Sequence, residues 1–113
     1  MSQVTIYHNP RCTKSRQTLA LLSERGIEPT VVEYLKNPPN EATIRKLLKK
    51  LGLEAAQLIR RKEYAALGLA GTDDPQTLIA HMAAHPEIIE RPIVVCGDKA
   101  RLGRPPEQVL EIL

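Results

Sequence analysis

Cys12 is the residue of this sequence best placed for covalent chemistry. It lies in the segment His8-Asn9-Pro10-Arg11-Cys12-Thr13-Lys14-Ser15-Arg16, between a β-branched, aromatic run and a run of helix-forming residues. The first N–H groups of a helix lack partners and its dipole is positive there, so a thiolate or an oxyanion is stabilised. Because three basic residues add to this field, we predict a reactive cysteine rather than an inert one. The serine three positions later excludes a Cys-x-x-Cys redox pair.

A lowered pKa at this thiol accounts for little rate by itself. A thiol with a pKa near ~8.5 is about 7% thiolate at pH 7.4, and one near ~6.5 is about 90% thiolate. The same two pKa units lower intrinsic nucleophilicity roughly 6–10-fold, which nearly cancels the gain. If the substrate is an oxyanion, guanidinium groups that bind it must supply most of the acceleration. We therefore expect arginines from elsewhere in the chain to converge on Cys12.

Three places in the sequence offer such arginines. They are the Arg60-Arg61 pair, Arg91 before Pro92, and Arg104 before Pro105. A solvated surface position is the ordinary role of any one arginine. Arg91-Pro92 begins a strand expected in the same sheet as the strand before Cys12, and its X-Pro bond is a candidate for the cis form. Arg104-Pro105 lies between a predicted hairpin and the last helix.

The elements that must position these residues follow from hydrophobic patterning. A strand over 4–7, a helix over 15–25 closed by Gly26, and a strand over 30–35 predict a parallel βαβ unit. A helix capped by Asn40 follows, with its apolar residues Ile44, Leu47, Leu48 and Leu51 inward, and then short helices over 54–69 and a helix from Asp74-Pro75 to about 84. Two strands, over 92–96 and 100–102, form a hairpin around a Gly97-Asp98 turn. The last element is a helix from Pro105-Pro106 with Val109, Leu110 and Leu113 inward. This order predicts an α/β, thioredoxin-like fold in a single domain over 1–113.

Composition narrows the class of protein. The chain has 113 residues, of which 42% are hydrophobic and 26% charged, as expected for a globular domain. It has no apolar run near the ~20 residues of a membrane span. No secretory signal follows Met1, and two cysteines 84 positions apart make no disulfide framework, so we expect a reducing cytoplasm.

The net charge of +3 is unevenly distributed. Residues 1–26, 45–62 and 91–104 carry +3, +6 and +3, and acidic segments separate these blocks. Brought together in the fold they would form an anion site, and strung out they would form a polyanion track. An aromatic content of 3% argues against a base-stacking surface, so nucleic acid is an unlikely partner.

The same residues resemble the ArsC-type arsenate reductases that use glutathione and glutaredoxin, especially their short chromosomal members. The resemblance covers the whole chain and is carried by these motifs: Ile6-Tyr7-His8-Asn9-Pro10-Arg11-Cys12 with Ser15-Arg16, Tyr34-Leu35 before Asn37-Pro38-Pro39, Leu58-Ile59-Arg60, His85-Pro86, Arg91-Pro92-Ile93-Val94-Val95, and Gly103-Arg104-Pro105-Pro106-Glu107. The N-terminal motif joined to Arg-Pro-Ile-Val-Val is specific, whereas either motif alone is weaker.

The resemblance implies a mechanism and a set of site residues. Cys12 would attack arsenate, His8 would favour its thiolate, and Arg60, Arg91 and Arg104 would bind the oxyanion. Thr13, Lys14, Ser15 and Arg16 would form the supporting loop. Glutathione would resolve the adduct and glutaredoxin would reduce the mixed disulfide, with no metal or bound cofactor. One departure concerns the substrate, since well-characterised members have Gly where this chain has Thr13.

Other interpretations stay open from the sequence. An Spx-like regulator that binds RNA polymerase would share the fold, although such proteins usually carry the Cys-x-x-Cys switch that Ser15 removes. A glutathione-dependent thiol reductase with another substrate would keep the thiol chemistry. Cys96 is more typical of a core residue than of a resolving thiol. His81 and His85 lie four apart on a predicted helix, but they lack the Glu of a His-Glu-x-x-His zinc motif.

Overall fold

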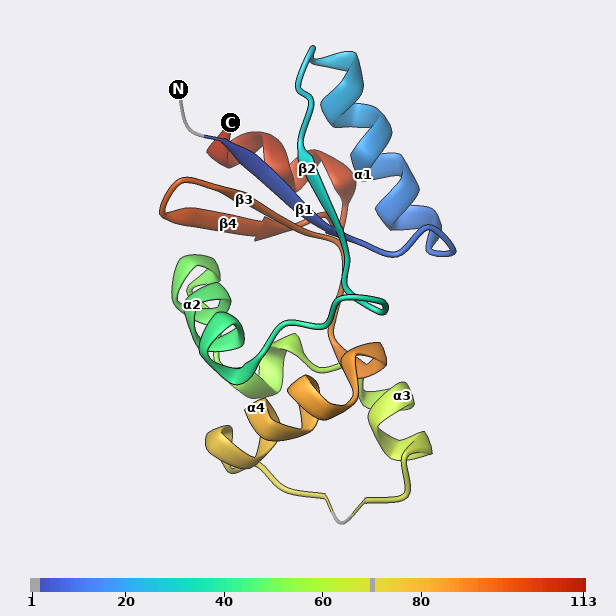
Figure 1. Ribbon diagram of the computed structural model, residues 1–113, viewed down its shortest axis with the longest axis vertical. Coiled ribbons are helices and arrows are strands. Elements are labelled where there is room, and N and C mark those ends of the chain that lie inside the picture. Colours follow the sequence, from blue (N-terminus) through green and yellow to red (C-terminus); the bar gives the residue numbers. More distant parts are fainter. Residues whose placement is uncertain (1–2, 70) are drawn as a thin grey trace. The chain divides into compact units, whose positions relative to one another are not determined.

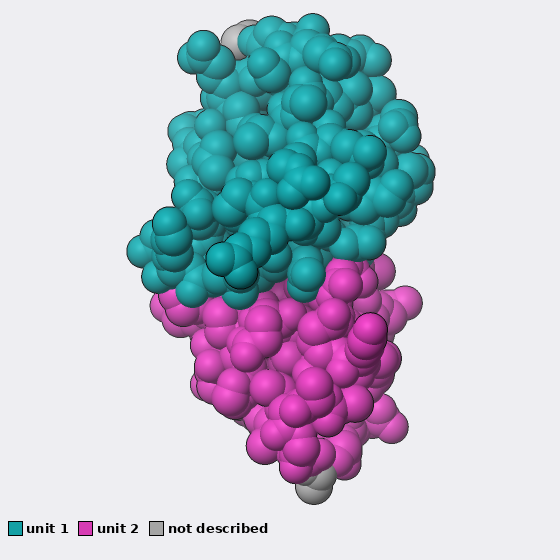
Figure 2. Space-filling view, turned by 90° about the vertical axis from the view of Figure 1, so that its right-hand side faces the viewer, with its two compact units in different colours: residues 1–37, 91–113 teal, residues 38–90 magenta. Residues whose placement is uncertain are grey.

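The computed structural model (Figure 1) describes residues 3–69 and 71–113. The chain forms two compact units, which Figure 2 shows in different colours: unit 1 contains residues 1–37 and 91–113, and unit 2 contains residues 38–90. Within the described residues, no helix is long and apolar enough to cross a membrane. The expectation of a single domain over 1–113 stays a prediction.

Unit 1 is built on a four-stranded mixed sheet. Its strands are β1 (Val4–His8), β2 (Thr30–Glu33), β3 (Ile93–Cys96) and β4 (Lys99–Leu102), in the order β2-β1-β3-β4. β1 pairs with β2 in parallel, and β3 runs antiparallel to both β1 and β4. The predicted parallel βαβ unit and the shared sheet of the Cys12 and Arg91 strands are therefore confirmed.

The first helix, α1 (Thr13–Glu24), connects β1 to β2. Gly26 follows it at φ 73°, a left-handed conformation that glycine adopts without steric cost, as predicted. The second strand is shorter than the expected 30–35, because the chain turns after Glu33. The Lys36 N–H donates to the Glu33 carbonyl at 2.9 Å.

The core of unit 1 lies on one face of this sheet. Alternation along β1 places its first, third and fifth residues on the buried face. The helix α1 and the C-terminal 3₁₀ helix η3 (Pro106–Ile112) pack against that face. The buried residues that meet there are Val4, Ile6, Leu22, Val94, Val109 and Ile112.

The C-terminal helix corrects one prediction. We expected Val109, Leu110 and Leu113 to point inward, but only Val109 is buried among them, and Leu113 is 44% exposed. The segment is a 3₁₀ helix, in which residues three apart lie on the same face. The buried positions are accordingly Pro106, Val109 and Ile112. An α-helical spacing had been assumed where the backbone winds more tightly.

Unit 2 is helical. It contains α2 (Glu41–Leu51), η1 (Ala55–Leu58), α3 (Arg61–Ala66), α4 (Pro75–Ala84) and η2 (Pro86–Ile88). The predicted N-caps are confirmed, since Asn40 accepts from the Thr43 N–H at 2.8 Å and Asp74 accepts from the Thr77 N–H at 3.0 Å. The expected apolar stripe of α2 is buried at Ile44, Leu47 and Leu48, while Leu51 is half-buried.

Candidate active site

The thiol is presented by a tight turn between β1 and α1. The Cys12 N–H donates to the Asn9 carbonyl at 3.0 Å, which closes a four-residue turn with Pro10 in its second position. The Asn9 side chain accepts from the Arg11 N–H at 3.0 Å. Asn in the first position and Pro in the second are the residues that such a turn favours. Cys12 consequently becomes the N-cap residue of α1, which begins at Thr13, two residues before the start expected from the sequence.

The environment of the Cys12 sulfur favours its ionised form. Burial raises the pKa of the thiol, but three groups together outweigh that effect and lower it: the Ser15 N–H, the hydrogen bond and charge of Arg91, and the charge of Arg104. The Arg104 Nη2 donates to Sγ at 3.5 Å. Sγ makes no capping hydrogen bond to the helix in this structure, and sulfur is a weak acceptor. The site therefore gains most of its interactions when the sulfur is a thiolate.

The two arginines are held together by backbone contacts at the ends of β3 and β4. Nε of Arg104 donates to the Arg91 carbonyl at 2.7 Å, and the Gly103 N–H donates to the Pro92 carbonyl at 3.0 Å. The Arg91-Pro92 bond is cis, as considered from the sequence, and so is Arg104-Pro105. Two residues separated by 13 positions thus approach Cys12 as one pair.

His8 contacts the loop through Ser15. Its Nδ1 lies 2.6 Å from the Ser15 hydroxyl oxygen, which also accepts from the Asn9 N–H at 3.0 Å. Burial lowers the pKa of His8 and Arg16 adds to that effect, whereas Glu33 opposes it. The ring is therefore biased toward its neutral form and supplies no stable positive charge at neutral pH. A direct role for His8 in favouring the thiolate stays a prediction.

Arg16 braces the outer side of the same loop. Its Nη1 donates to the Pro10 carbonyl at 2.9 Å and its Nη2 donates to the Thr13 hydroxyl at 3.3 Å. Thr13 and Lys14 are exposed. The Thr13 side chain, at the position where the sequence departs from the pattern it resembles, is thus engaged by Arg16. These contacts give the predicted supporting loop a structural basis.

Arg60 belongs to unit 2, where two carboxylates bind it. Its Nη1 lies 2.8 Å from Oε1 of Glu90, and its Nε lies 3.1 Å from Oε2 of Glu63. Burial lowers the pKa of Arg60, but these carboxylates outweigh burial and raise it. The Arg60 N–H also donates to the Ile88 carbonyl at 2.7 Å, which fixes its backbone beside η2. Convergence of Arg60 on Cys12 stays a prediction, while its neighbour Arg61 is exposed.

Cys96 lies at the other end of β1 from Cys12. It pairs with Val4, the first residue of that strand, whereas Cys12 follows the last residue, and the strand between them spans roughly 13 Å. A disulfide needs Cα atoms within about 7 Å, so Cys96 is not placed to resolve a Cys12 adduct. Both cysteines are free and half-buried. Cys96 packs beside the core cluster, close to the role expected for it.

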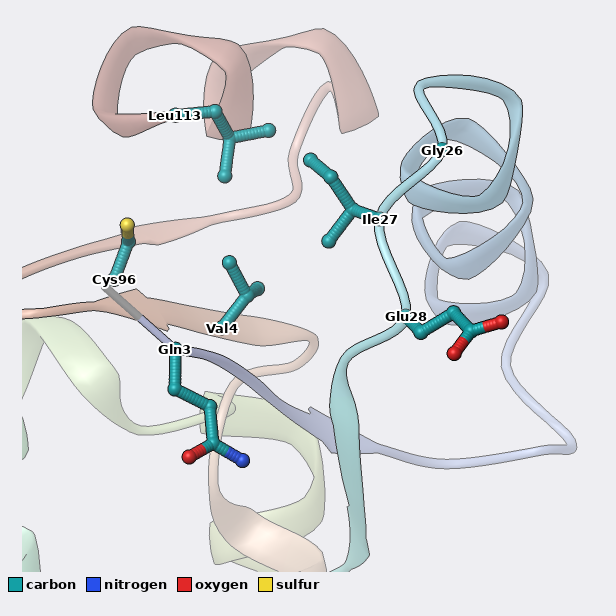
Figure 3. Close-up of a pocket in the computed structure, with 7 residues that line it drawn as sticks. All are labelled: Gln3, Val4, Gly26, Ile27, Glu28, Cys96 and Leu113. Carbon is teal, nitrogen blue, oxygen red and sulfur yellow. The ribbon is translucent and has the colours of Figure 1, made fainter. Parts of the chain in front are cut away.

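The larger recess of unit 1 is also remote from the thiol. It measures about 470 Å³ and is lined largely by apolar atoms, with Cys96, Ile27 and Leu113 around its mouth (Figure 3). A smaller recess of about 340 Å³ runs along α1 from Lys14 toward Glu24 and is closed by Pro105. Since chemistry needs the thiol and its arginines, we place the candidate site at Cys12 rather than in either recess.

The histidines of α4 have an ordinary structural environment. Nδ1 of His81 lies 2.9 Å from the Tyr64 hydroxyl, and their rings are tilted by 42° at a centroid separation of 5.7 Å. Across residues 3–69 and 71–113, no group of three His, Cys, Asp or Glu side chains could hold a metal ion.

Sequence reasoning missed a buried polar stripe on α1. Ser15 and Thr18 are both 0% exposed and share a helix face with Leu22. The spacing 15, 18, 22 is the signal that would have revealed it, because residues three and four apart lie on one face of a helix.

The chain is similar to known proteins over nearly its whole length. Residues 7–112 match the model of the ArsC family. Uncharacterized protein YfgD of Escherichia coli (strain K12) is 56% identical, covering 98% of this chain and 97% of that protein. The arsenate reductase of Haemophilus influenzae is 47% identical, covering 97% of this chain and 98% of its own.

Solved structures agree with these sequence matches. The arsenate reductase from Vibrio cholerae has a TM-score of 0.88 and 50% identity, covering 99% of this chain and 98% of that one. A protein from Yersinia pestis described as a putative arsenate reductase has the same TM-score at 52% identity, over 97% and 100% of the two chains. The predicted α/β, thioredoxin-like fold is confirmed.

Proposed function

Because the chain belongs to the ArsC family, we propose that it reduces arsenate to arsenite with Cys12 as the nucleophile. The observation that carries the proposal is the placement of the Cys12 sulfur at the N-terminus of α1, 3.5 Å from Nη2 of Arg104. Relatives at 47% to 50% identity that are named arsenate reductases support the choice of substrate.

The first step of the proposed reaction is attack of the thiolate on arsenic. The sulfur forms an S–As bond while an arsenate oxygen leaves as water after protonation. The Arg91 and Arg104 guanidinium groups that lower the pKa of the thiol also neutralise the negative charge of the incoming oxyanion. Planar N–H forks match the edges of a tetrahedral oxyanion, so arginine suits this task better than lysine. Arg60 is the third proposed oxyanion ligand. To bind arsenate, it must give up contacts with the Glu63 and Glu90 carboxylates of unit 2.

The second step needs a thiol from outside the chain, because Cys96 lies at the far end of β1. Glutathione attacks the Cys12 sulfur, the S–As bond breaks, and its electron pair stays on arsenic, which leaves as arsenite. A Cys12–glutathione disulfide forms, and glutaredoxin reduces it. Arsenic gains two electrons and two thiols lose them, so the proposed reaction requires neither metal nor bound cofactor. These reductants belong to a reducing compartment, and we place the protein in the cytoplasm.

The test is a coupled assay on the full chain. Protein, arsenate, glutathione, glutaredoxin, glutathione reductase and NADPH are mixed, and NADPH oxidation is followed. We expect oxidation that depends on arsenate and disappears in Cys12→Ser, while Cys96→Ser, the matched control at the other cysteine, keeps the native rate. An unchanged rate in Cys12→Ser would refute the mechanism. A reactive Cys12 without arsenate turnover would refute the substrate and favour a thiol reductase of another small molecule.

A further inference from the structure

Gly103 sits where the strand ends of unit 1 come closest to α1. It follows β4, it is buried, and it directly precedes Arg104. A Cβ atom built on Gly103 would overlap the Thr18 hydroxyl oxygen, lie 2.7 Å from Cγ of Pro92 and lie 3.1 Å from Cγ2 of Thr18. Gly103 is not one of the described glycines with a positive φ, so its backbone conformation is open to residues other than glycine. Space, and not conformation, requires glycine at this position.

Thr18, on the other side of this contact, is held in place by burial and a hydrogen bond. Thr18 is 0% exposed, and its hydroxyl donates to the Lys14 carbonyl at 2.8 Å, which fixes its side-chain rotamer. Thr18 lies on the same helix that carries Cys12 at its N-cap. Gly103 is joined to Pro92 by a backbone hydrogen bond of 3.0 Å. The contact therefore joins the element that carries the thiol to the two segments that carry Arg91 and Arg104.

We propose that Gly103 is a positioning residue: because it has no side chain, the strand ends that bear Arg91 and Arg104 can lie close against Thr18 of α1, the helix that carries Cys12 at its N-cap. Neither Gly103 nor Thr18 touches the reacting atoms. The Arg104 Nη2 lies 3.5 Å from the Cys12 sulfur, within the distance of an N–H···S hydrogen bond, so an outward shift of residues 103–104 lengthens and weakens this contact. The inference rests on the proposed function for the identity of the substrate, but the geometry of the thiol can be tested without any substrate.

The decisive variant is Gly103→Ala. A methyl group there has to push the 103–104 segment away from α1, because close-packed interiors offer no room for it. We expect the pKa of Cys12 to rise by about one unit, and the rate of alkylation by iodoacetamide well below that pKa to fall about tenfold. Gly71→Ala is the matched control: Gly71 also has no positive φ, nothing lies within 4 Å of its Cβ position, and we expect no change in the alkylation rate.

A compensating variant separates positioning from loss of folding. Thr18→Ala removes both Thr18 atoms that crowd position 103, leaving only the Pro92 contact. We expect Thr18→Ala/Gly103→Ala to recover part of the native alkylation rate, because the 2.7 Å approach to Cγ of Pro92 remains. Thr18→Ala alone should lose stability but keep the native rate. Thr18→Val, which keeps the shape and removes the hydroxyl, should also keep it.

Two results would overturn the proposal. One is a folded Gly103→Ala whose thiol titrates like the native one. The other is a Thr18→Ala/Gly103→Ala variant that recovers none of the native alkylation rate although Thr18→Ala folds. This second result counts against the proposal even if Gly103→Ala itself fails to fold. If only the proposed function is wrong, the unmodified chain will show a Cys12 thiol with a lowered pKa but no arsenate turnover. The two failures are thus distinguishable in the same set of proteins.

Discussion

Arginines and helix N-termini occur in both units of the chain, but they are used in different ways. In unit 1, Arg91 and Arg104 favour a thiolate, and α1 begins at a cysteine whose side chain makes no capping hydrogen bond. In unit 2, Arg60 binds two carboxylates, and α2 begins at an asparagine that caps it. Arg60 and the first turn of α2 in unit 2 thus have protein partners, whereas Arg91 and Arg104 of unit 1 act on one sulfur. The difference teaches that the partner of an arginine, and not its presence, marks an anion site.

The largest expected effect is on the thiol itself. Arg104→Met removes the donor 3.5 Å from Sγ, so the pKa of Cys12 should rise. The midpoint of the alkylation rate against pH should lie below the ordinary thiol pKa of 9.0 in the native chain and at a higher pH in the variant. We expect the rate on the acidic side to fall about tenfold. Arg60→Met is the matched variant in unit 2 and should leave the profile unchanged. An equal shift in both variants would remove the contrast between the units.

The carboxylates around Arg60 offer the next largest effect. Glu90→Gln keeps an acceptor but removes the charge from a pair that is only 22% and 23% exposed. We expect a loss of about 1–2 kcal/mol in the free energy of unfolding, measured by urea denaturation at neutral pH. The arsenate KM sharpens the result. A lower KM means that Glu90 competes with substrate for Arg60, and an unchanged KM means that Arg60 has a structural role only.

Substitutions at the N-caps of α2 and α1 should change the free energy of unfolding by smaller amounts and in opposite directions. Asn40→Ala removes the bond to the Thr43 N–H and should cost about 1 kcal/mol of unfolding free energy. Cys12→Ser places a good capping residue on α1 and should cost nothing, or stabilise by up to about 1 kcal/mol, while it abolishes thiol chemistry. Urea midpoints for the two variants measure this directly. Equal losses in both would show that the N-terminus of α1 is already satisfied.

The smallest effect concerns the pH dependence of stability. Burial lowers the pKa of His8 in the folded chain below its usual 6.5, so the unfolded chain takes up this proton more readily. The contribution of His8 is then fully present above about pH 6.5 and is lost as the pH falls through the lower folded value. His8→Asn should flatten the fall in unfolding free energy between pH 7 and 5. A steeper fall in the variant would show that protonated His8 stabilises the fold.

Much of the architecture was readable from short-range patterns. Asn40 and Asp74 were recognised as caps, Gly26 as a helix end, and Cys12 as a residue at a strand-to-helix turn, because each depends on neighbours within a few positions. Apolar periodicity likewise predicted the sheet and the buried face of α2. It failed at the C-terminus, where the choice between α and 3₁₀ winding changed which of Leu113 and Ile112 was buried.

The site required contacts that no local spacing encodes. Arg104 reaches Cys12 across 92 positions, and Arg60 reaches Glu90 across 30. The first contact makes an arginine part of an electropositive site, and the second neutralises one that looks equivalent in the sequence. Gly103 is required only because Thr18 occupies the adjacent space. The amino-acid order specified the elements and the nucleophile, since these depend on local backbone preference and periodicity. Tertiary packing alone assigned each charge its partner, because partners are chosen by proximity in three dimensions.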